Sequence, residues 1–229
     1  MPDHPSTPAT AAIADASIRL GIPLRTAPVS LVPLTPGVIF HGPARPITHL
    51  GSVDVLLETI DDAPPGSVMV IDNGGRHDEA CVGDLMVLEA QLAGLSALVI
   101  WGRHRDTAQL REIGLPLFSL GSSSFGPRRV PPAGRPMRSA YLDGAAVTED
   151  DEVVGDDDGV LFLGPERRRE LLELAATIQQ TEAAQADRMR AGTSLREQLD
   201  FAGYRRQQAV DPGLTLRQHL LTRGNSIEV

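Results

Sequence analysis

Residues 83–106 read GDLMVLEAQLAGLSALVIWGRHRD, an apolar segment with charged residues at both ends. Its first part has the length and composition of a helix over 84–93. The next part, SALVIW at 96–101, is a short apolar run that predicts a buried strand. Acidic and basic residues therefore flank a predicted helix–strand unit, with twenty residues between Asp84 and Arg105.

The segments on either side extend this unit into an alternating pattern. SVMVID at 67–72 predicts a buried strand, and a polar, glycine-bearing loop at 73–83 follows it. Beyond the opening segment, DTAQLREIG at 106–114 predicts a short helix, and LPLFSL after it predicts a strand. The order strand, helix, strand, helix, strand predicts an α/β domain with a partly parallel sheet.

The remaining segments divide the chain into three parts. Residues 1–9 are expected to be disordered, 10–163 to form the α/β domain, and 164–229 to form a C-terminal helical extension. We expect the extension to belong to the same domain and to take part in a subunit interface. Within these parts the sequence predicts helices over 10–21, 52–63, 166–192, 194–203 and 214–222, with short β pieces over 128–163.

Composition narrows the classes of partner. The net charge of −9 disfavours nucleic acid, because binding phosphates needs a basic face. No apolar run approaches the length of a membrane span, and the N-terminus lacks the features of a secretory signal. The single cysteine, Cys81, excludes an internal disulfide and suits a reducing cytoplasm.

The chain contains no lysine, since all 21 basic residues are arginines. A genomic bias towards arginine codons is the simplest explanation. The chemical consequence is that no Schiff base can form on a lysine side chain. Chemistry at a substrate carbonyl must therefore use a metal ion or hydrogen-bond donors.

The two charged ends of the opening segment are expected to meet in space. If the strands at 67–72 and 96–101 are parallel neighbours, their C-terminal ends share the sheet edge where α/β proteins bind ligands. A helix start at Gly83 offers free amides to an anion, and Arg105 can grip a carboxylate. Asp84 and Asp106 supply the hard oxygens that magnesium or manganese prefers. Spacing by itself favours a simpler interpretation, in which both aspartates are helix N-caps and Arg105 pairs with one of them.

The stretch from about 37 to 163 resembles the RraA-like family, most clearly in VIDNGG, GDLMVLEAQLAGLSALVIWGRHRD, LREIGLPLFS and DDDGVLFL. That family includes the regulator of ribonuclease E activity and metal-dependent 4-hydroxy-4-methyl-2-oxoglutarate/4-carboxy-4-hydroxy-2-oxoadipate aldolases. The resemblance implies a swivelling β/β/α-type domain and a trimer or hexamer with sites between subunits. A neighbouring subunit's C-terminal region would contribute an acidic group, which cannot be placed on this sequence.

The resemblance also implies roles for individual residues. The aldolase branch carries an aspartate, twenty residues and then Arg-Asp, which match Asp84, Arg105 and Asp106. The Arg105 side chain would bind a pyruvate-like substrate together with the amides of the helix start, which belong to Gly83, Asp84, Leu85 and Met86. Asp106 would hold Mg²⁺ or Mn²⁺ directly, with Asp84 acting through water. The family often has an acidic residue three places after that aspartate, where this chain has Gln109.

The leading hypothesis is therefore a divalent-metal-dependent lyase with Arg105 and Asp84 as catalytic residues. It would cleave a 4-hydroxy-2-oxo acid to pyruvate and a second oxo acid, or decarboxylate oxaloacetate, through a metal-stabilised enolate. The alternative is a non-enzymatic regulator that binds a partner protein, as the ribonuclease E inhibitor does. A third possibility is an enzyme of this family that acts on an unrelated substrate.

Other chemistry-bearing residues have simpler interpretations. His77 and His104 lie in the loops beside the proposed site and could move protons, but surface loop histidines are the simpler reading of both. A strand-like backbone at His104 would also point its side chain away from Arg105. Cys81 lacks a nucleophile's setting and is expected to be buried. The acidic run 149–158 does not have the spacing of an EF-hand and predicts a solvated turn.

Overall fold

The computed structural model describes residues 7–129 and 138–222, so the predicted disorder at 1–9 falls mostly outside the described residues. The chain forms two compact units. As far as the structure describes them, the first contains Met1–Ala11 and Pro23–Arg168, and the second contains Ala12–Ile22 and Arg169–Val229. The functional residues predicted above all belong to the first unit.

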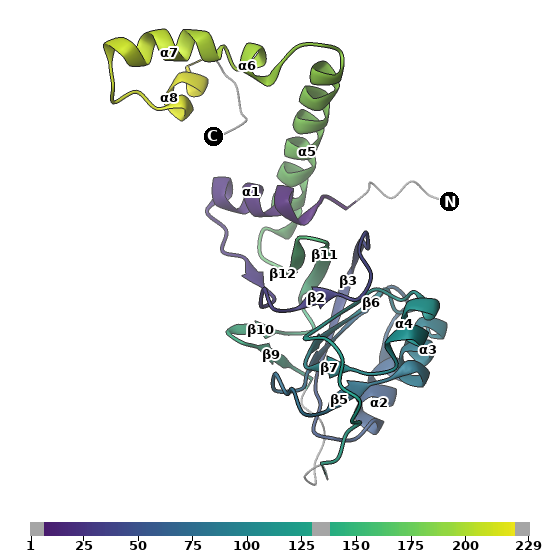
Figure 1. Cartoon of the computed structure of the whole chain (residues 1–229). Helices are drawn as coiled ribbons and strands as arrows, with labels where there is room; N and C mark the ends of the chain where they lie inside the picture. Colours follow the sequence, from purple (N-terminus) through teal and green to yellow (C-terminus); the bar gives the residue numbers. More distant parts are fainter. Residues whose placement is uncertain (1–6, 130–137, 223–229) are drawn as a thin grey trace. The chain divides into compact units, whose positions relative to one another are not determined.

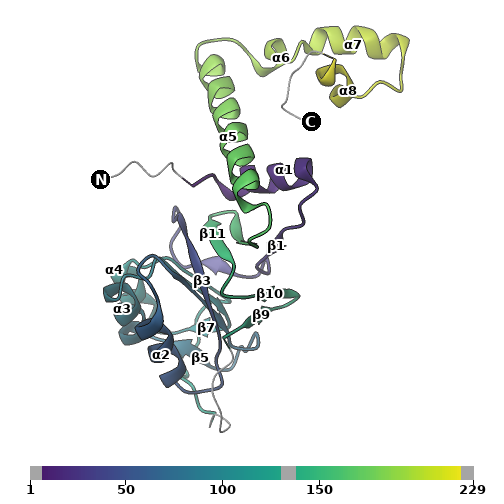
Figure 2. The same ribbon diagram turned by 180° about the vertical axis from the view of Figure 1, so that it is seen from behind.

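The first unit is built on one curled, partly parallel sheet of eight strands (Figures 1 and 2). Its strand order is β1-β12-β11-β3-β4-β6-β8-β2. The strands β3, β4, β6 and β8 run parallel to one another, and the strands outside this group pair antiparallel. The bounds are β1 Arg25–Thr26, β2 Val32–Pro33, β3 Phe40–Thr48, β4 Val68–Asp72, β6 Ala97–Trp101, β8 Leu117–Ser119, β11 Glu152–Asp156 and β12 Gly159–Leu163.

The long strand β3 joins the parallel and antiparallel parts of the sheet. Its first residues, from Phe40 to Pro43, pair antiparallel with β11. From Ala44 to Thr48 it pairs parallel with β4, so one strand takes part in both halves. Through β3, the β-rich segment that contains β11 and β12 joins the same sheet as the parallel strands of the α/β part.

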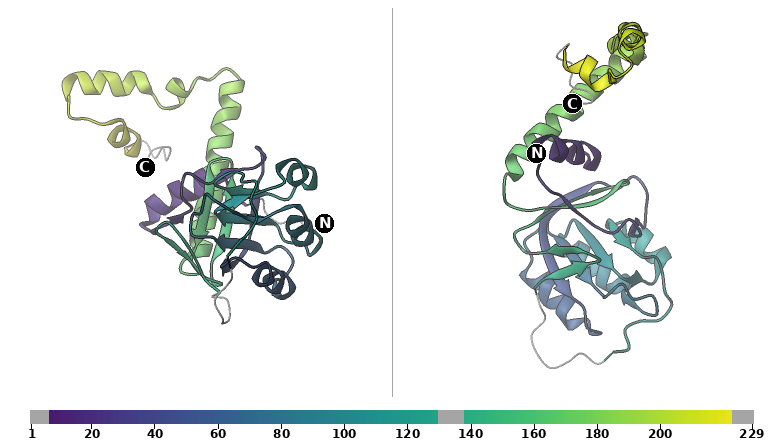
Figure 3. Two further views of the ribbon diagram at one scale, coloured as in Figure 1. Left: turned by 60° about the horizontal axis from the view of Figure 1, so that its bottom comes forward. Right: turned by 90° about the vertical axis from the view of Figure 1, so that its left-hand side faces the viewer.

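Side chains alternate between the two faces of the parallel strands, as the period of a strand requires. In β4, Met69 and Ile71 pack with the helices α2, α3 and α4, whereas Val68 and Val70 face the opposite core. The three helices stand side by side on one face of the sheet (Figure 3, left). Their bounds are α2 Asp54–Asp62, α3 Asp84–Leu92 and α4 Thr107–Ile113. The hairpin of β9 (Ala140–Leu142) and β10 (Ala145–Val147) supplies apolar side chains to the other core.

A small two-stranded ladder lies beyond the C-terminal ends of β4 and β6. It consists of β5 (Ala80–Val82) and β7 (Arg103–His104), which pair parallel. Val82 is the partner of His104, so the residues that follow each strand emerge next to each other. This ladder positions the candidate site.

The second unit is helical. It contains most of α1 (Thr10–Leu20) together with α5 (Arg168–Arg190), α6 (Leu195–Gln198), α7 (Phe201–Val210) and α8 (Leu216–Leu221). The predicted single helix over 194–203 is wrong, because Asp200 adopts a left-handed conformation (φ 46°) that separates α6 from α7. The Asp200 side chain then accepts a hydrogen bond from the Gly203 amide and caps α7.

The predicted fold class is confirmed. The expected helices and strands between residues 52 and 120 occur within a few residues of their predicted bounds. The α2 helix begins after Val53, and no side chain caps its start. No helix in the described part of the chain is both long and apolar enough to cross a membrane. A role of the C-terminal extension in a subunit interface stays a prediction.

Candidate functional site

The structure brings Asp84, Arg105 and Asp106 together at the C-terminal edge of the sheet. The Arg105 amide donates a hydrogen bond to the Val82 carbonyl (3.0 Å), which extends the β5–β7 pairing by one residue. The start of α3 and the Arg105–Asp106 turn therefore lie against each other, although twenty residues separate Asp84 from Arg105 in the chain. The convergence expected from the sequence is thus present in the fold.

Asp106 has an unusual backbone and does not cap its own helix. It occupies the N-cap position of α4 in a left-handed conformation (φ 60°, ψ 40°), and its side chain makes no cap hydrogen bond. Its Oδ2 instead accepts from the Asp84 amide (3.3 Å) and lies 3.3 Å from Arg105 Nε. The predicted N-cap role is wrong, because this carboxylate points at the start of α3. Strained backbone of this kind is often kept at functional sites.

The start of α3 already holds carboxylate oxygens. Gly83 is the N-cap residue, and Asp84 is the first residue of the helix. The simpler interpretation, in which Asp84 is the N-cap, is therefore wrong. The Leu85 amide donates to Asp84 Oδ1 (2.8 Å), and the Asp84 amide donates to Asp106. These amides therefore bind anionic oxygens, as the positive end of a helix dipole favours.

Gly83 leaves space that no other residue would leave. A Cβ atom at this position would lie 2.4 Å from Asp106 Oδ2 and 3.0 Å from Arg105 Nε. The Gly83 backbone is extended (φ −134°), so glycine is needed for this close approach and not for its conformational freedom. The hydrogen at Gly83 thus allows both side chains to pack over the helix start.

The Arg105 side chain is about half exposed (48%), and its charged end is bounded on two sides. Asp106 lies beside Nε, and the Gly126 backbone lies beside Nη1, where an added Cβ would be only 2.8 Å away. A partly exposed, partly confined guanidinium is suited to binding a small carboxylate from solution.

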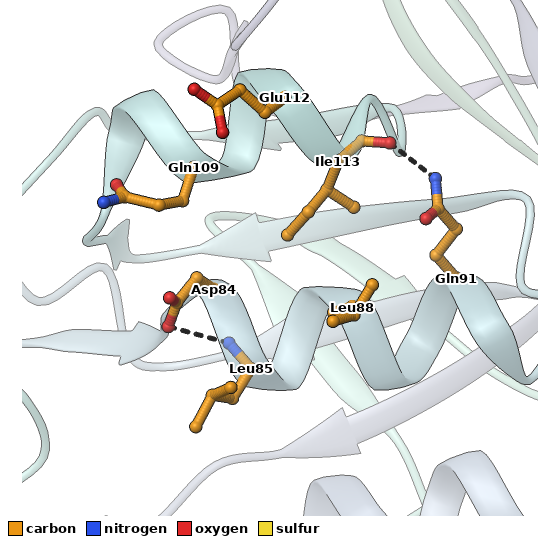
Figure 4. Close-up of a pocket in the computed structure, with 7 residues that line it drawn as sticks. All are labelled: Asp84, Leu85, Leu88, Gln91, Gln109, Glu112 and Ile113. Atoms are coloured by element: carbon orange, nitrogen blue, oxygen red, sulfur yellow. Dashed lines mark hydrogen bonds between the residues drawn. The ribbon is translucent and has the colours of Figure 1, made fainter.

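A groove between α3 and α4 opens from this site (Figure 4). Asp84 and Gln109 lie at one end of it, and the Gln91 side chain donates to the Ile113 carbonyl (2.6 Å) at the other. Its volume is about 440 Å³, and Leu85, Leu88 and Glu112 complete its lining. Gln109 therefore lies near Asp84, where the family often has an acidic residue.

The other candidates lie outside this cluster. His104 is buried, so the expectation of a surface histidine is wrong; it bonds Ser119 Oγ (2.8 Å) and Thr107 Oγ1 (3.1 Å). Burial, with lesser contributions from nearby arginines, lowers the pKa of His104. His77 is exposed, as expected, and contacts Arg103 (2.9 Å). Cys81 is buried, as expected, and burial raises its thiol pKa to about 12, which excludes a ready nucleophile.

The donor set suits a weakly held divalent cation. Asp84 begins α3, Asp106 directly precedes α4, and the two meet where the Asp84 amide donates to Asp106 Oδ2; Mg²⁺ often binds through one or two carboxylates while keeping several waters. Within residues 7–129 and 138–222, no group of three or more His, Cys, Asp or Glu side chains forms a denser metal site. The pair therefore fits magnesium or manganese better than a closed zinc centre.

Sequence reasoning missed a buried polar group beside the site. Glu79 and Arg129 form an ion pair (2.7 Å), and Arg129 also donates to Asn73 Oδ1 (2.7 Å). Asn73 Oδ1 in turn contacts His49 Nδ1 (2.9 Å). These residues come from three separate segments, the turn after β3, the loop 73–83 and the stretch around residue 129, so no local spacing could have revealed them. The one available signal was an acidic residue directly before an apolar strand.

Comparison with known proteins finds a matching family and several relatives. A family model described as "RraA-like: Aldolase/RraA" matches residues 10–162. The chain is 29% identical over 176 residues to Protein DlpA of Legionella pneumophila. This match covers 74% of the chain but only 28% of DlpA, so the chain spans about a quarter of that relative.

Solved structures with a similar fold include two that are 26% identical to this chain. An uncharacterized protein from Pseudomonas syringae pv. tomato is 26% identical with a TM-score of 0.72, over 83% of this chain and 92% of that one. Streptomyces coelicolor RraAS2, described as an unusual member of the RNase ES inhibitor RraA protein family, is also 26% identical. Its TM-score is 0.66, over 76% of this chain and 89% of RraAS2.

Proposed function

This chain belongs to the RraA-like family, and from that premise we propose that it is a divalent-metal-dependent lyase acting on small 2-oxo acids. The family covers both aldolases and ribonuclease inhibitors. The observation that favours the enzyme is the cluster of Asp84, Arg105 and Asp106 at one sheet edge, linked by contacts of 3.3 Å. The reaction would cleave a 4-hydroxy-2-oxo acid to pyruvate and a second oxo acid, or decarboxylate oxaloacetate.

Substrate binding follows from the charges of the site. The carboxylate of a 2-oxo acid would lie against the Arg105 guanidinium and the first amides of α3, at Gly83, Asp84, Leu85 and Met86. Two of these amides, those of Asp84 and Leu85, already donate hydrogen bonds to carboxylate oxygens of the chain itself. Asp106 Oδ2 must therefore release the Asp84 amide when a substrate carboxylate takes its place.

Both reactions leave an electron pair at C3 of a pyruvate unit, so the site must stabilise an enolate and protonate that carbon. Asp106 would hold Mg²⁺ or Mn²⁺, with Asp84 reaching it through water. The bound cation supplies positive charge that stabilises the enolate. Arg105 adds a second positive charge and fixes the carboxylate. Asp84 would orient the water that gives a proton to C3. No lysine is present to support the imine alternative.

Members of the family commonly form oligomers, and we propose a trimer or a hexamer for this chain. Two leucines on α3 are largely exposed: Leu85, which lines the groove, at 78%, and Leu92, the last residue of the helix, at 74%. An apolar surface of this kind suits contact with another subunit. Light scattering at micromolar concentration tests this, and a monomer would contradict it.

The second candidate function is a regulator that binds a ribonuclease, as RraAS2's family description indicates for that protein. Its likeness to this chain, at 26% identity, keeps this candidate open. A binding surface for another protein does not require an arginine and two carboxylates packed at a helix start. The two functions differ in what Asp106 should do, since only the lyase needs its carboxylate.

The direct test is pyruvate release by the purified full chain from oxaloacetate and from 4-hydroxy-4-methyl-2-oxoglutarate. We expect turnover with Mg²⁺ or Mn²⁺, loss of turnover after treatment with a chelator, and recovery when either metal is restored. Absence of metal-dependent turnover of every 2-oxo acid tested, together with tight binding of a ribonuclease, would replace the lyase with the regulator.

A further inference from the structure

Glu79 is a buried carboxylate next to the candidate site. Its side chain is only 3% exposed, and it directly precedes β5, the strand that leads to Gly83. Taking a carboxylate out of water is costly unless strong partners replace the water. The partners of Glu79 therefore show what this buried charge holds in place.

Both oxygens of Glu79 bind the same distant segment, residues 125–129, and Oε1 also lies 3.4 Å from Arg76 Nε in its own loop. Oε1 accepts from Arg129 Nε (2.8 Å) and lies 2.7 Å from Arg129 Nη2. Oε2 accepts from the Arg128 backbone amide (3.3 Å). The neighbouring Ala80 amide donates to the Phe125 carbonyl (2.7 Å), so the segment is attached at both of its ends.

The middle of this segment touches Arg105. An added Cβ at Gly126 would lie 2.8 Å from Arg105 Nη1 and 3.5 Å from Cζ, so the Gly126 backbone forms a wall beside the guanidinium. Asp106 Oδ2 lies beside Arg105 Nε (3.3 Å). An arginine side chain has many rotamers, and holding one of them costs entropy that a preformed wall reduces.

We propose that Glu79 is a positioning residue, which fixes the 125–129 segment so that Gly126 holds the Arg105 guanidinium in its carboxylate-binding orientation. This inference rests on the proposed function of Arg105. Glu79 itself does not touch the substrate in this account. Its charge holds the Arg128 amide and the Arg129 side chain, and these fix the nearby Gly126 backbone that lies beside Arg105.

The first test compares Glu79→Gln with Asp78→Asn in the full chain. Glutamine keeps the size of Glu79 but removes the charge that holds Arg129. Asp78 is the neighbouring carboxylate, is 69% exposed and pairs only with Arg76 in the described contacts, so Asp78→Asn is a matched control. We expect Glu79→Gln to raise KM for oxaloacetate on the order of tenfold with a smaller change in kcat, since Arg105 holds the carboxylate throughout the reaction. Asp78→Asn should match the wild type.

Gly126→Ala reaches the same contact without touching Glu79. The backbone of Gly126 is not in the left-handed region, so alanine is tolerated there, but its Cβ would push Nη1 by roughly half an ångström. We expect the same rise in KM. In an Arg105→Lys background neither substitution should add a further effect, because the group that they position is gone. If Glu79→Gln and Gly126→Ala both keep the wild-type KM, the positioning role is wrong.

A second readout does not depend on catalysis. Trypsin cuts after Arg128 and Arg129, and the 125–129 segment should be cut faster in Glu79→Gln than in the wild type or in Asp78→Asn. Wild-type protein without any turnover would refute the proposed lyase while leaving this assay intact. Equal cleavage rates in Glu79→Gln and the wild type would then show that Glu79 does not hold the segment, and would refute the inference separately.

Discussion

Gly83→Ala should disturb the geometry of the site while leaving the stability of the fold nearly unchanged. Alanine can adopt the extended backbone of Gly83, so no backbone strain results. Its Cβ would lie 2.4 Å from Asp106 Oδ2, whereas ordinary contact begins at 3.4 Å, so the carboxylate must move by about 1 Å. Arg105 Nε, at 3.0 Å, must move as well. Oδ2 ends the Asp106 side chain and Nε belongs to the long, flexible Arg105 side chain, so both can yield without disturbing the core.

The expected magnitudes follow from these distances. Loss of a glycine N-cap costs less than about 1 kcal/mol of unfolding free energy, and the smaller entropy of the unfolded chain offsets part of it. A misplacement of 1 Å at reacting groups can lower kcat/KM by about 100-fold. We therefore expect a shift in melting temperature within about 2–4 °C and a loss of activity far larger than that shift suggests.

The assay is pyruvate release from oxaloacetate with Mg²⁺, next to thermal unfolding of the same samples. Gly164→Ala is the matched control, because its Cβ would only come within 3.4 Å of Arg25 and its backbone is also outside the left-handed region. We expect that control to keep both stability and activity. A Gly83→Ala protein that keeps wild-type kcat/KM would refute the reasoning, since the positions of Asp106 and Arg105 would then not matter.

Three further predictions concern single side chains. Arg105→Lys keeps the positive charge but loses the two-pronged carboxylate grip, so kcat/KM should fall by about 10²-fold or more, and near wild-type kinetics would contradict this role. Burial lowers the pKa of His104, so the unfolded chain takes up the proton first, and the unfolding free energy should fall as the pH drops below about 6.5. Urea unfolding between pH 7 and pH 5.5 should show a shallower fall for His104→Gln, and equal slopes would contradict the assignment. The Cys81 thiol, with its pKa raised to about 12, should react with a thiol reagent only after unfolding, so fast reaction of the native protein would contradict its burial.

The sequence was sufficient for the part of the fold that local pattern controls. Apolar runs of strand length on both sides of an apolar segment of helix length predicted β4, α3 and β6, and parallel pairing then placed Asp84 near Arg105. The helix break at Asp200 was missed, because a left-handed residue other than glycine leaves no clear mark in the sequence.

The finer geometry of the site could not be predicted from local sequence patterns. Asp106 follows the rule for an N-cap residue, yet its carboxylate points at α3 because the turn after β7 is left-handed. The partners that give Glu79 and Gly126 their proposed roles lie about 50 and about 20 residues away, and such distances in sequence give no periodic signal. A contact between distant segments has to be observed in the folded chain.

The most direct test of the lyase hypothesis is the kcat/KM for metal-dependent pyruvate release from oxaloacetate by Asp106→Ala, measured against the wild type. Asp106 makes no cap hydrogen bond to its own helix, so alanine removes its contacts with Asp84 and Arg105 and adds backbone strain of about 1–2 kcal/mol at φ 60°; the variant should remain folded. We predict that wild-type turnover depends on Mg²⁺ or Mn²⁺ and that Asp106→Ala loses both turnover and metal binding. Equal metal-dependent turnover in the two proteins would contradict the placement of the metal at Asp106, and no turnover by the wild type would contradict the lyase itself.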